Sequence, residues 1–416
     1  MNYKIFAPSR IYAEVGLPAS KSISNRMLIL NALCPGGKGH LSNIAKCDDT
    51  DAMVTALNSD RELVNVGAAG TAMRFLTAYF ATRAGKTTIL DGTERMRHRP
   101  IAILVDALRR CCAEIEYLGE EGFPPLKITG KALRADSIEI PGNVSSQYIS
   151  AILMVAPLMK CQTITLTGDI ISTPYIKMTL TLMRLMGVEC SFKGNMITLP
   201  NNATYSAQDF VIESDWSAAS YWFEMQALLP YSRITLKGLM RQSAQGDAEV
   251  AQLFSNFGVC NISCGTYLDL RAYPAGNDEI IMNLKDTPDL AQTIVVTACL
   301  TNRHFHISGL QTLKIKETDR IEALRSQLRK LGYVIEVLPD FSMQWHGEMC
   351  EPEENPRIAT FSDHRMAMAF APAAVKFPGI VIEDVSVVNK SYPHFWKHLL
   401  AAGFRMEDDC GKEAAQ

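Results

Sequence analysis

The stretch that decides the fold is LMRLMGVEC at residues 182–190, where an amphipathic helix pattern ends at Gly187 and a short strand pattern follows. The same form recurs in LFSNFGVCN at 253–261, LRKLGYVIE at 328–336 and LLAAGFRME at 399–407. Glycine is favoured there because it adopts the left-handed backbone that ends many helices. Gly187, Gly258, Gly332 and Gly403 stand at intervals of 71, 74 and 71 residues, and a weaker copy, LRRCCAEIE at 108–116, places Ala113 at the same point. This spacing predicts a structural unit of ~70 residues.

The pattern around these stretches indicates an α/β fold. Runs rich in β-branched residues at 163–167 and 379–383 favour strands, whereas residues 101–110 and 321–331 have apolar side chains at helical spacing. A chain of 416 residues holds about six units of this length. Six units divide naturally into two lobes of three.

Composition excludes several classes of protein. The 41 Lys and Arg residues against 44 Asp and Glu residues give a net charge of −3, which would repel a polyphosphate backbone. Eleven cysteines with no C-x-x-C pair suit a reducing compartment, and no apolar run approaches the ~18 residues of a membrane span. No spacing of His and Cys is typical of zinc. We expect a cytoplasmic protein with no nucleic acid, membrane, metal or cofactor.

Four stretches in the first half place small, hydroxyl or cationic residues where a helix begins. They are LPASKSISNR at 17–26, GAAGTAMRFL at 67–76, RMRHRP at 95–100 and PGNVSSQYISA at 141–151. Free N–H groups at a helix start attract anions, and neighbouring cations strengthen that attraction. Taken singly, the first stretch is most often an ordinary capped helix with solvated cations, and a tight turn explains the second equally well. A surface charge run is the usual explanation of the third, yet so many cations at one helix start fit a bound phosphate better. A plain N-cap needs only one of the three polar side chains in the fourth.

Two stretches in the second half combine cations with carboxylates. In KIKETDRIEAL at 314–324, Lys316 and Arg320 are expected to share one face of a helix, with Glu317 beside them. In TFSDHRMAMAF at 360–370, Asp363 is the expected N-cap and Arg365 lies in the first turn, where a cation opposes the helix dipole unless an anion binds. An ion-pair lattice within the helix explains the first stretch equally well.

The motifs taken together resemble the 5-enolpyruvylshikimate-3-phosphate synthase family, from about residue 18 to residue 393. They occur in the order LPASKSISNR, GTAMRFL, RMRHRPI, VSSQY, STPYIK, DWSAASY, QGD, PD, KETDR, DHRMAM and KSYPHF. The resemblance implies an α/β fold of two lobes, each with three βαβαββ-type units, and an active site in the cleft between them. It places the first lobe at 20–212 and the second at 1–19 with 213–416.

The resemblance also implies a reaction: transfer of the enolpyruvyl group of phosphoenolpyruvate to the 5-hydroxyl of shikimate 3-phosphate, with release of phosphate. We expect a monomer that needs no cofactor. The implied shikimate 3-phosphate site is Lys21, Ser22, Arg26, Ser145, Ser146, Gln147, Ser172, Tyr175, Asp289, Thr312 and Lys316. The implied phosphoenolpyruvate site is Lys21, Gly70, Arg99, Gln147, Arg320, Arg365 and Lys390, and the implied catalytic groups are Asp289, Glu317, Lys21 and Lys390.

Two positions depart from the family pattern. Ala68 stands where most relatives have Asn, and Thr312 stands where relatives often have Asn. The nearest alternative is a UDP-N-acetylglucosamine enolpyruvyl transferase, but that family usually has Asn where this chain has Ser22, and it carries a catalytic Cys that the RMRHRP loop lacks. A non-catalytic anion-binding protein is the alternative of another class.

Overall fold

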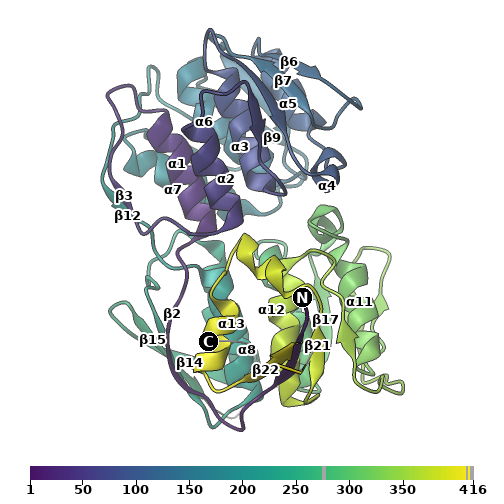
Figure 1. Ribbon diagram of the computed structural model, residues 1–416. Coiled ribbons are helices and arrows are strands. Elements are labelled where there is room, and N and C mark those ends of the chain that lie inside the picture. The colour runs from purple at the N-terminus through teal and green to yellow at the C-terminus, as the bar shows by residue number, and fades with distance from the viewer. Residues whose placement is uncertain (274–277, 409–410, 413–416) are drawn as a thin grey trace. The chain divides into compact units, whose positions relative to one another are not determined.

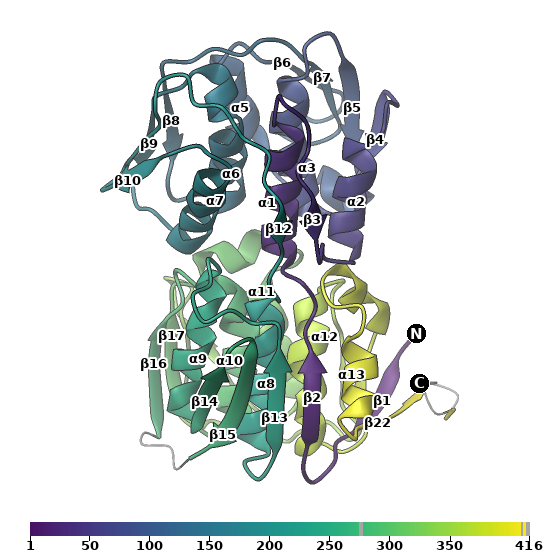
Figure 2. The same ribbon diagram turned by 90° about the vertical axis from the view of Figure 1, so that its left-hand side faces the viewer.

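The computed structural model describes residues 1–273, 278–408 and 411–412. Contacts between Cα atoms divide the chain into two compact units. Residues 19–212 form one, called here the insertion unit; residues 1–18 and 213–416 form the other, called the terminal unit because it holds both ends of the chain. In each unit, sheets face outward around a packed set of helices (Figures 1 and 2).

Every four-stranded sheet of the described chain has the same topology. In spatial order, the first two strands are parallel to each other, and each of the next two is antiparallel to the strand before it. The insertion unit has two such sheets and one parallel pair. Their strands, in spatial order, are β4 (Leu63–Asn65), β5 (Thr87–Asp91), β7 (Leu126–Thr129) and β6 (Glu114–Tyr117); β8 (Ser137–Pro141), β9 (Thr163–Thr167), β11 (Met196–Thr198) and β10 (Ser191–Lys193); and β3 (Leu41–Ser42) with β12 (Phe210–Val211).

The terminal unit has three four-stranded sheets of that topology. In the third sheet the N-terminal strand β1 lies between β21 and β22, so that Tyr3 is opposite both Ile382 and Asp408. The sheets are β2 (Tyr12–Gly16), β13 (Arg233–Lys237), β15 (Tyr267–Ala272) and β14 (Val259–Cys264); β16 (Glu279–Asn283), β17 (His304–Ser308), β19 (Met343–Trp345) and β18 (Glu336–Val337); and β20 (Arg357–Ile358), β21 (Ile380–Ile382), β1 (Tyr3–Phe6) and β22 (Arg405–Asp408).

The α-helices fill the space between the sheets. All ten residues of α10 are buried, which is expected of a helix that is apolar on every side. The helices are α1 (Lys21–Ala32), α2 (Asp48–Leu57), α3 (Gly70–Ala81), α4 (Glu94–Arg97), α5 (Ala102–Arg110), α6 (Ser146–Val155), α7 (Thr173–Leu185), α8 (Trp216–Leu228), α9 (Val250–Leu253), α10 (Ala291–Leu300), α11 (Arg320–Lys330), α12 (His364–Phe370) and α13 (Phe395–Ala401).

Short 3-10 helices extend or precede several of them. They are η1 (Ala156–Met159), η2 (Gly246–Glu249), η3 (Phe254–Phe257), η4 (Pro288–Leu290), η5 (Gln311–Ile315), η6 (Ala371–Val375) and η7 (Val385–Lys390). In chain order, β4, α3, β5, α5, β6 and β7 form one βαβαββ unit, and β8 to β11 with α6 and α7 form the next. The α/β fold class and the repeated unit are therefore confirmed. Within the described residues, no helix has the length and apolarity needed to cross a bilayer.

The helix ends explain why the glycines recur. Gly187, Gly258, Gly332 and Gly403 all have φ between 76° and 95°, which confirms the expected left-handed conformation. The prediction for the weaker copy was one residue off. Cys112, with φ of 67°, takes the left-handed position and its amide donates to Arg109, while Ala113 follows it. Cys112 is also exposed, although its neighbour Cys111 is buried.

Candidate active site

Most of the residues singled out by the sequence lie around helix N-termini, in both units. In the insertion unit, Ser20 caps α1 by accepting from the amide of Ile23, and Lys21 follows as the first helical residue. Nζ of Lys21 lies 3.0 Å from Oδ2 of Asp49, which is in the first turn of α2. Both side chains are largely buried, so the pair holds a cation in place at the start of α1.

Arg26 lies one turn further along α1 and is buried against α6 and α7. Its Nε donates to Oγ1 of Thr179 over 2.8 Å. Its NH2 donates to Oγ of Ser150, and its NH1 donates to the carbonyl of Ser22, each over 3.0 Å. Burial lowers the pKa of the guanidinium to about 10, against a smaller opposing effect of Tyr175. A buried cation bonded to neutral oxygens favours an anion nearby.

Gly70 is the first residue of α3, and cationic side chains cover it closely. A Cβ atom at this position would lie 2.5 Å from NH1 of Arg99 and 2.9 Å from NH1 of Arg74. Gln147, in the first turn of α6, donates from Nε2 to Oγ1 of Thr71 over 3.1 Å. Gly70, Arg99 and Gln147, all expected around phosphoenolpyruvate, are thus tied to the start of one helix.

The remaining insertion-unit candidates lie at the starts of α6 and α7. Ser145 is the N-cap of α6, with its Oγ accepting from the amide of Gln147, and Ser146 is the first helical residue. Ser172 precedes α7 in a left-handed conformation with φ of 54°, and Tyr175 lies in the first turn. Hydroxyl groups therefore recur at both helix starts.

In the terminal unit, Arg320 is the centre of a buried ion-pair cluster. The side chain is 1% exposed, and three carboxylates surround it. Its Nε lies 2.7 Å from Oδ2 of Asp363, NH2 lies 2.8 Å from Oε2 of Glu317, and NH1 lies 3.1 Å from Oδ1 of Asp289. Burial alone would lower the pKa of Arg320, but the three carboxylates outweigh it and raise the pKa.

Asp289 joins this cluster to the other predicted cations. Its Oδ2 lies 3.1 Å from NH2 of Arg365, and its Oδ1 lies 3.6 Å from Nζ of Lys316. Lys390, at the end of η7, instead donates to the carbonyl of Ser362 over 2.7 Å. Thr312 lies in η5, and its buried Oγ1 has no hydrogen bond within the part of the chain that the structure describes.

One local prediction in this region was wrong. Lys316 and Glu317 do not share a helix with Arg320, because α11 begins at Arg320 itself. Asp319 is the N-cap and accepts from the amide of Glu322 over 3.2 Å, which stops the helix from extending backward. Lys316 is extended, with φ of −80° and ψ of −151°. Glu317 therefore approaches Arg320 from a loop.

Sequence reasoning gave no site role to Asp363 or Asp247. Asp363 was expected only as a cap, yet it is also the shortest ion-pair partner of Arg320. Asp247, from the QGD motif, is buried and accepts from Oγ of Ser217. Burial and then the charge of Asp289 raise its pKa to about 7. Its signal in the sequence was a carboxylate at the start of a short helix next to a glycine.

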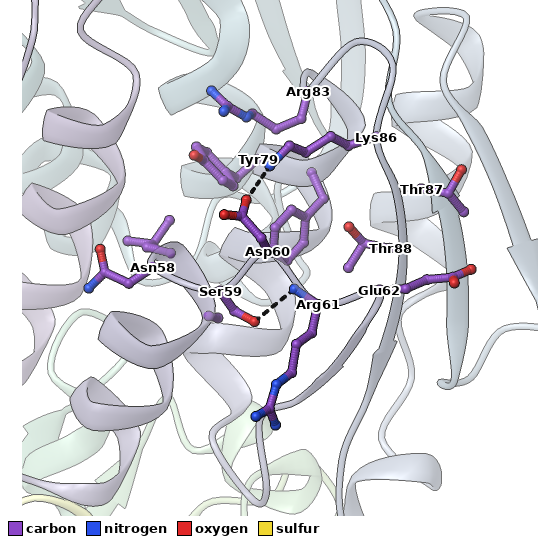
Figure 3. A pocket seen from close by; sticks show the side chains of 13 residues that line it. Asn58, Ser59, Asp60, Arg61, Glu62, Tyr79, Arg83, Lys86, Thr87 and Thr88 are labelled. Atoms are coloured by element: carbon purple, nitrogen blue, oxygen red, sulfur yellow. Dashed lines mark hydrogen bonds and ion pairs between the residues drawn. The ribbon is translucent and has the colours of Figure 1, made fainter.

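A hollow of about 520 Å³ lies elsewhere on the insertion unit (Figure 3). Its wall includes residues 56–62, which are the end of α2 and the turn after it, together with Tyr79 in the last turn of α3 and Arg83 just beyond that helix. Nζ of Lys86 reaches Oδ1 of Asp60 over 2.6 Å, and Asp60 is mostly exposed. This hollow lies at helix C-termini and contains none of the candidate residues.

Metal-ligating side chains do not gather in the described ranges: no group of three or more His, Cys, Asp or Glu residues there is arranged to hold an ion. The chemistry available at the two sets of residues is therefore that of cations, hydroxyls and paired carboxylates, one set in each unit. Guanidinium and ammonium groups suit phosphate and carboxylate ligands, and carboxylates can move protons.

Comparison with known proteins gives consistent results. Residues 5–64 and 58–399 match the family described as EPSP synthase (3-phosphoshikimate 1-carboxyvinyltransferase). The 3-phosphoshikimate 1-carboxyvinyltransferase of Bacteroides fragilis strain YCH46 is 50% identical over 405 residues, covering 97% of this chain and 98% of that protein. The enzyme of that name from Pasteurella multocida is 35% identical, covering 94% of this chain and 96% of that protein. The EPSP synthase structure from Acinetobacter baumannii has a similar fold, with a TM-score of 0.75 at 20% identity, covering 98% of this chain and all of that one.

Proposed function

The chain belongs to the EPSP synthase (3-phosphoshikimate 1-carboxyvinyltransferase) family, and we propose that it transfers the enolpyruvyl group of phosphoenolpyruvate to the 5-hydroxyl of shikimate 3-phosphate. The relative at 50% identity carries the name of this activity and is covered almost end to end. The observation on this chain that carries the proposal is the cluster in which Arg320 meets Asp289 and Glu317 within 3.1 Å. Such a cluster combines a cation for the substrate carboxylate with groups that move protons.

Anion binding in the insertion unit is assigned to the helix starts. Ser145, Ser146 and Ser172, with Lys21 and Arg26, would hold shikimate 3-phosphate, since hydroxyls and cations at helix N-termini suit a phosphate and a carboxylate. Further contacts to shikimate 3-phosphate are assigned to Ser22, Gln147 and Tyr175 of this unit and to Asp289, Thr312 and Lys316 of the terminal unit. Phosphoenolpyruvate would meet Lys21, Gly70, Arg99 and Gln147 from this unit and Arg320, Arg365 and Lys390 from the terminal unit.

The reaction needs an acid and a base. The 5-hydroxyl oxygen attacks C2 of phosphoenolpyruvate and loses its proton, while C3 gains a proton, which gives a tetrahedral ketal phosphate. The C2–O bond to phosphate then breaks, C3 loses a proton and the enol ether forms. Asp289 and Glu317 are the proposed proton carriers, and Lys21 and Lys390 stabilise the departing phosphate.

The hydrogen bonds of Arg320 suggest how substrate frees a carboxylate. A guanidinium has five N–H donors, and four of those on Arg320 point to Asp363, Asp289 and Glu317. A substrate carboxylate that binds Arg320 in a bidentate manner must replace one of these acceptors. Glu317 approaches from a loop, so it is the acceptor that can move with least disturbance. Its release would supply the proton carrier as the substrate arrives.

The test is a phosphate-release assay with phosphoenolpyruvate and each of two acceptors. Release with shikimate 3-phosphate and none with UDP-N-acetylglucosamine supports the proposal, and mass spectrometry should identify the enolpyruvyl ether. Release only with the UDP sugar would favour the related transferase. Binding of both anions without phosphate release would indicate a non-catalytic binding protein.

The proposal extends to the state of the enzyme. We assign it as a cytoplasmic monomer without a metal or organic cofactor, because eleven cysteines without a pairing pattern suit a reducing compartment and because the proposed steps need only acid, base and cations. Sedimentation at working concentration tests the monomer, and assay after exhaustive chelation tests the absence of a metal.

A further inference from the structure

Resting on the proposed function, we infer that Arg74 is a positioning residue for the phosphoenolpyruvate site of the insertion unit. Arg74 fixes the start of α3 and the segment at 95–100, which runs from α4 toward α5, so that Arg99 is held against Gly70. Arg74 lies in the GTAMRFL motif, but the sequence alone predicts no site role for it. Arg74 is 4% exposed, so it acts through its neighbours.

The hydrogen bonds of Arg74 join three points of the chain. NH1 donates to the carbonyl of Gly70 over 3.0 Å, and NH2 donates to the carbonyl of Pro100 over 3.3 Å. NH1 also lies 3.8 Å from the sulfur of Met96, which is in α4. Arg99 lies between Met96 and Pro100, so both flanks of this residue are held by one guanidinium.

Tyr148 completes the arrangement from α6. Its hydroxyl donates to the same carbonyl of Pro100, and the guanidinium carbon of Arg74 lies 5.9 Å from the centre of its ring. The residue before it, Gln147, donates to Thr71 beside Gly70. The carbonyl of Pro100 is thus shared by two buried donors, which fixes the end of the loop relative to α3 and α6.

The positions of the nitrogens explain why an arginine is needed. NH1 of Arg74 and NH1 of Arg99 both approach the point where a Cβ atom of Gly70 would be. Arg74 needs its planar fork to reach two carbonyls at once, which the single ammonium of lysine cannot do in the same geometry. Arg74 thus keeps a second positive charge next to Arg99, where an anion is proposed to bind.

The same device occurs on α1. Arg26 donates to the carbonyl of Ser22, four residues earlier, and lies 5.2 Å from the centre of the Phe75 ring. Arg74 likewise donates to the carbonyl four residues earlier and faces an aromatic ring. A buried arginine that reaches back to the first helical turn is therefore a recurring way of fixing a ligand-binding helix start in this unit.

The experiment compares Arg74→Lys with Arg109→Lys in the full-length enzyme. Arg109 is the control because it also donates to a backbone carbonyl, that of Ile115, and lies 4.9 Å from the centre of the Tyr117 ring, and neither of these partners is a candidate site residue. We expect Arg74→Lys to raise KM for phosphoenolpyruvate about tenfold or more, with kcat changed less than threefold and with unchanged affinity for shikimate 3-phosphate by titration calorimetry. Arg109→Lys should leave all three within twofold.

A second variant covers the case in which Arg74→Lys fails to fold. Tyr148→Phe keeps the ring under Arg74 but removes one donor to Pro100, and should raise KM for phosphoenolpyruvate about threefold. A lower melting temperature with unchanged KM in the variants would overturn the inference and leave Arg74 as a structural residue. Absence of turnover in the unmodified protein would contradict the proposed function instead, so the two failures are distinguishable.

Discussion

Nε of Arg320 donates to Oδ2 of Asp363 over 2.7 Å, and the two side chains are 1% and 0% exposed. The other oxygen of Asp363 caps α12 by accepting from the amide of Arg365 over 2.9 Å. One carboxylate therefore fixes both arginines that are proposed to bind the carboxylate of phosphoenolpyruvate. Its buried position makes it the least exchangeable of the partners of Arg320.

Asp363→Asn should be strongly destabilising. Asparagine caps a helix as well as aspartate, so the substitution removes the charge but keeps the cap. Arg320 then loses its shortest charged partner in a buried place, and breaking a buried pair typically costs about 3–5 kcal/mol. Urea denaturation of the two proteins at pH 7 measures the difference in free energy of unfolding.

The control for this change is Asp319→Asn. Asp319 is the N-cap of α11, and its carboxylate is 4.0 Å from Lys314 at a partly exposed position. Loss of an exposed pair changes stability by about 1 kcal/mol or less. Equal losses in the two variants would mean that the Arg320–Asp363 pair adds nothing to the cap.

Asp289→Ala and Glu317→Gln should each lower kcat by about 10² or more, the scale expected when a general acid or base is lost. Affinity should change less for Glu317→Gln, because the amide keeps the shape of the carboxylate. Steady-state kinetics with both substrates varied, together with melting temperatures, measures these effects. If Glu317 only balances the charge of Arg320, its variant will keep a normal kcat at saturation while its KM or stability changes.

Gly70→Ala should raise KM for phosphoenolpyruvate and weaken competition by glyphosate, which presents a carboxylate and a phosphonate. The added methyl group would lie 2.5 Å from NH1 of Arg99, so the guanidinium must move. Gly36→Ala is the matched control, because a Cβ atom there meets nothing within 4 Å. Inhibition kinetics against phosphoenolpyruvate decide the matter, and noncompetitive inhibition by glyphosate in the unmodified enzyme would contradict a shared site.

We predict that the buried Glu224 makes the terminal unit less stable as pH rises. It is fully buried on α8, and neither carboxylate oxygen has a hydrogen bond among residues 1–273, 278–408 and 411–412. Burial raises its pKa well above the ordinary value of 4.5. The folded state therefore keeps a proton that the unfolded state releases, so the free energy of unfolding falls as pH rises above about 4.5, by up to ~1.4 kcal/mol per pH unit.

Glu224→Gln removes the titrating carboxyl group. The variant should therefore gain stability relative to the unmodified protein as pH rises from 5 to 7. Urea denaturation at several pH values gives the difference. Glu120→Gln, at an exposed position, is the control and should stay within about 0.5 kcal/mol throughout. A constant difference between the Glu224 variant and the unmodified protein across the range would refute the buried proton.

The repeat could be predicted because glycine marks the second helix of each unit. The end of the first helix carries no such signal: Lys160 and Asn302 adopt the same left-handed conformation, with φ of 57° and 53°. The smallest sheet could not be predicted from the sequence either, because β3 and β12 have two residues each and come from opposite ends of the insertion unit. Short strands carry too few side chains for a period to appear.

At the candidate site, residue type and helix start could be predicted, but partners could not. Asp363 and Arg320 are 43 residues apart, and only the packing of α11 against its neighbours brings them together. The burial of Asp247 likewise depends on tertiary structure. Arg74 has the sequence context of an ordinary helical arginine, and only the structure shows that the segment at 95–100 packs against it.

The place of β1 between β21 and β22 has a consequence for synthesis of the protein on the ribosome. Tyr3 and its partner Asp408 are 405 residues apart in the chain, so Tyr3 is made long before Asp408. At about 5–20 residues per second, β1 waits on the order of 20 to 80 s without either neighbour. Residues 19–212 are complete long before that, so the insertion unit can fold while translation continues, whereas the third sheet of the terminal unit can close only after β22 has been made.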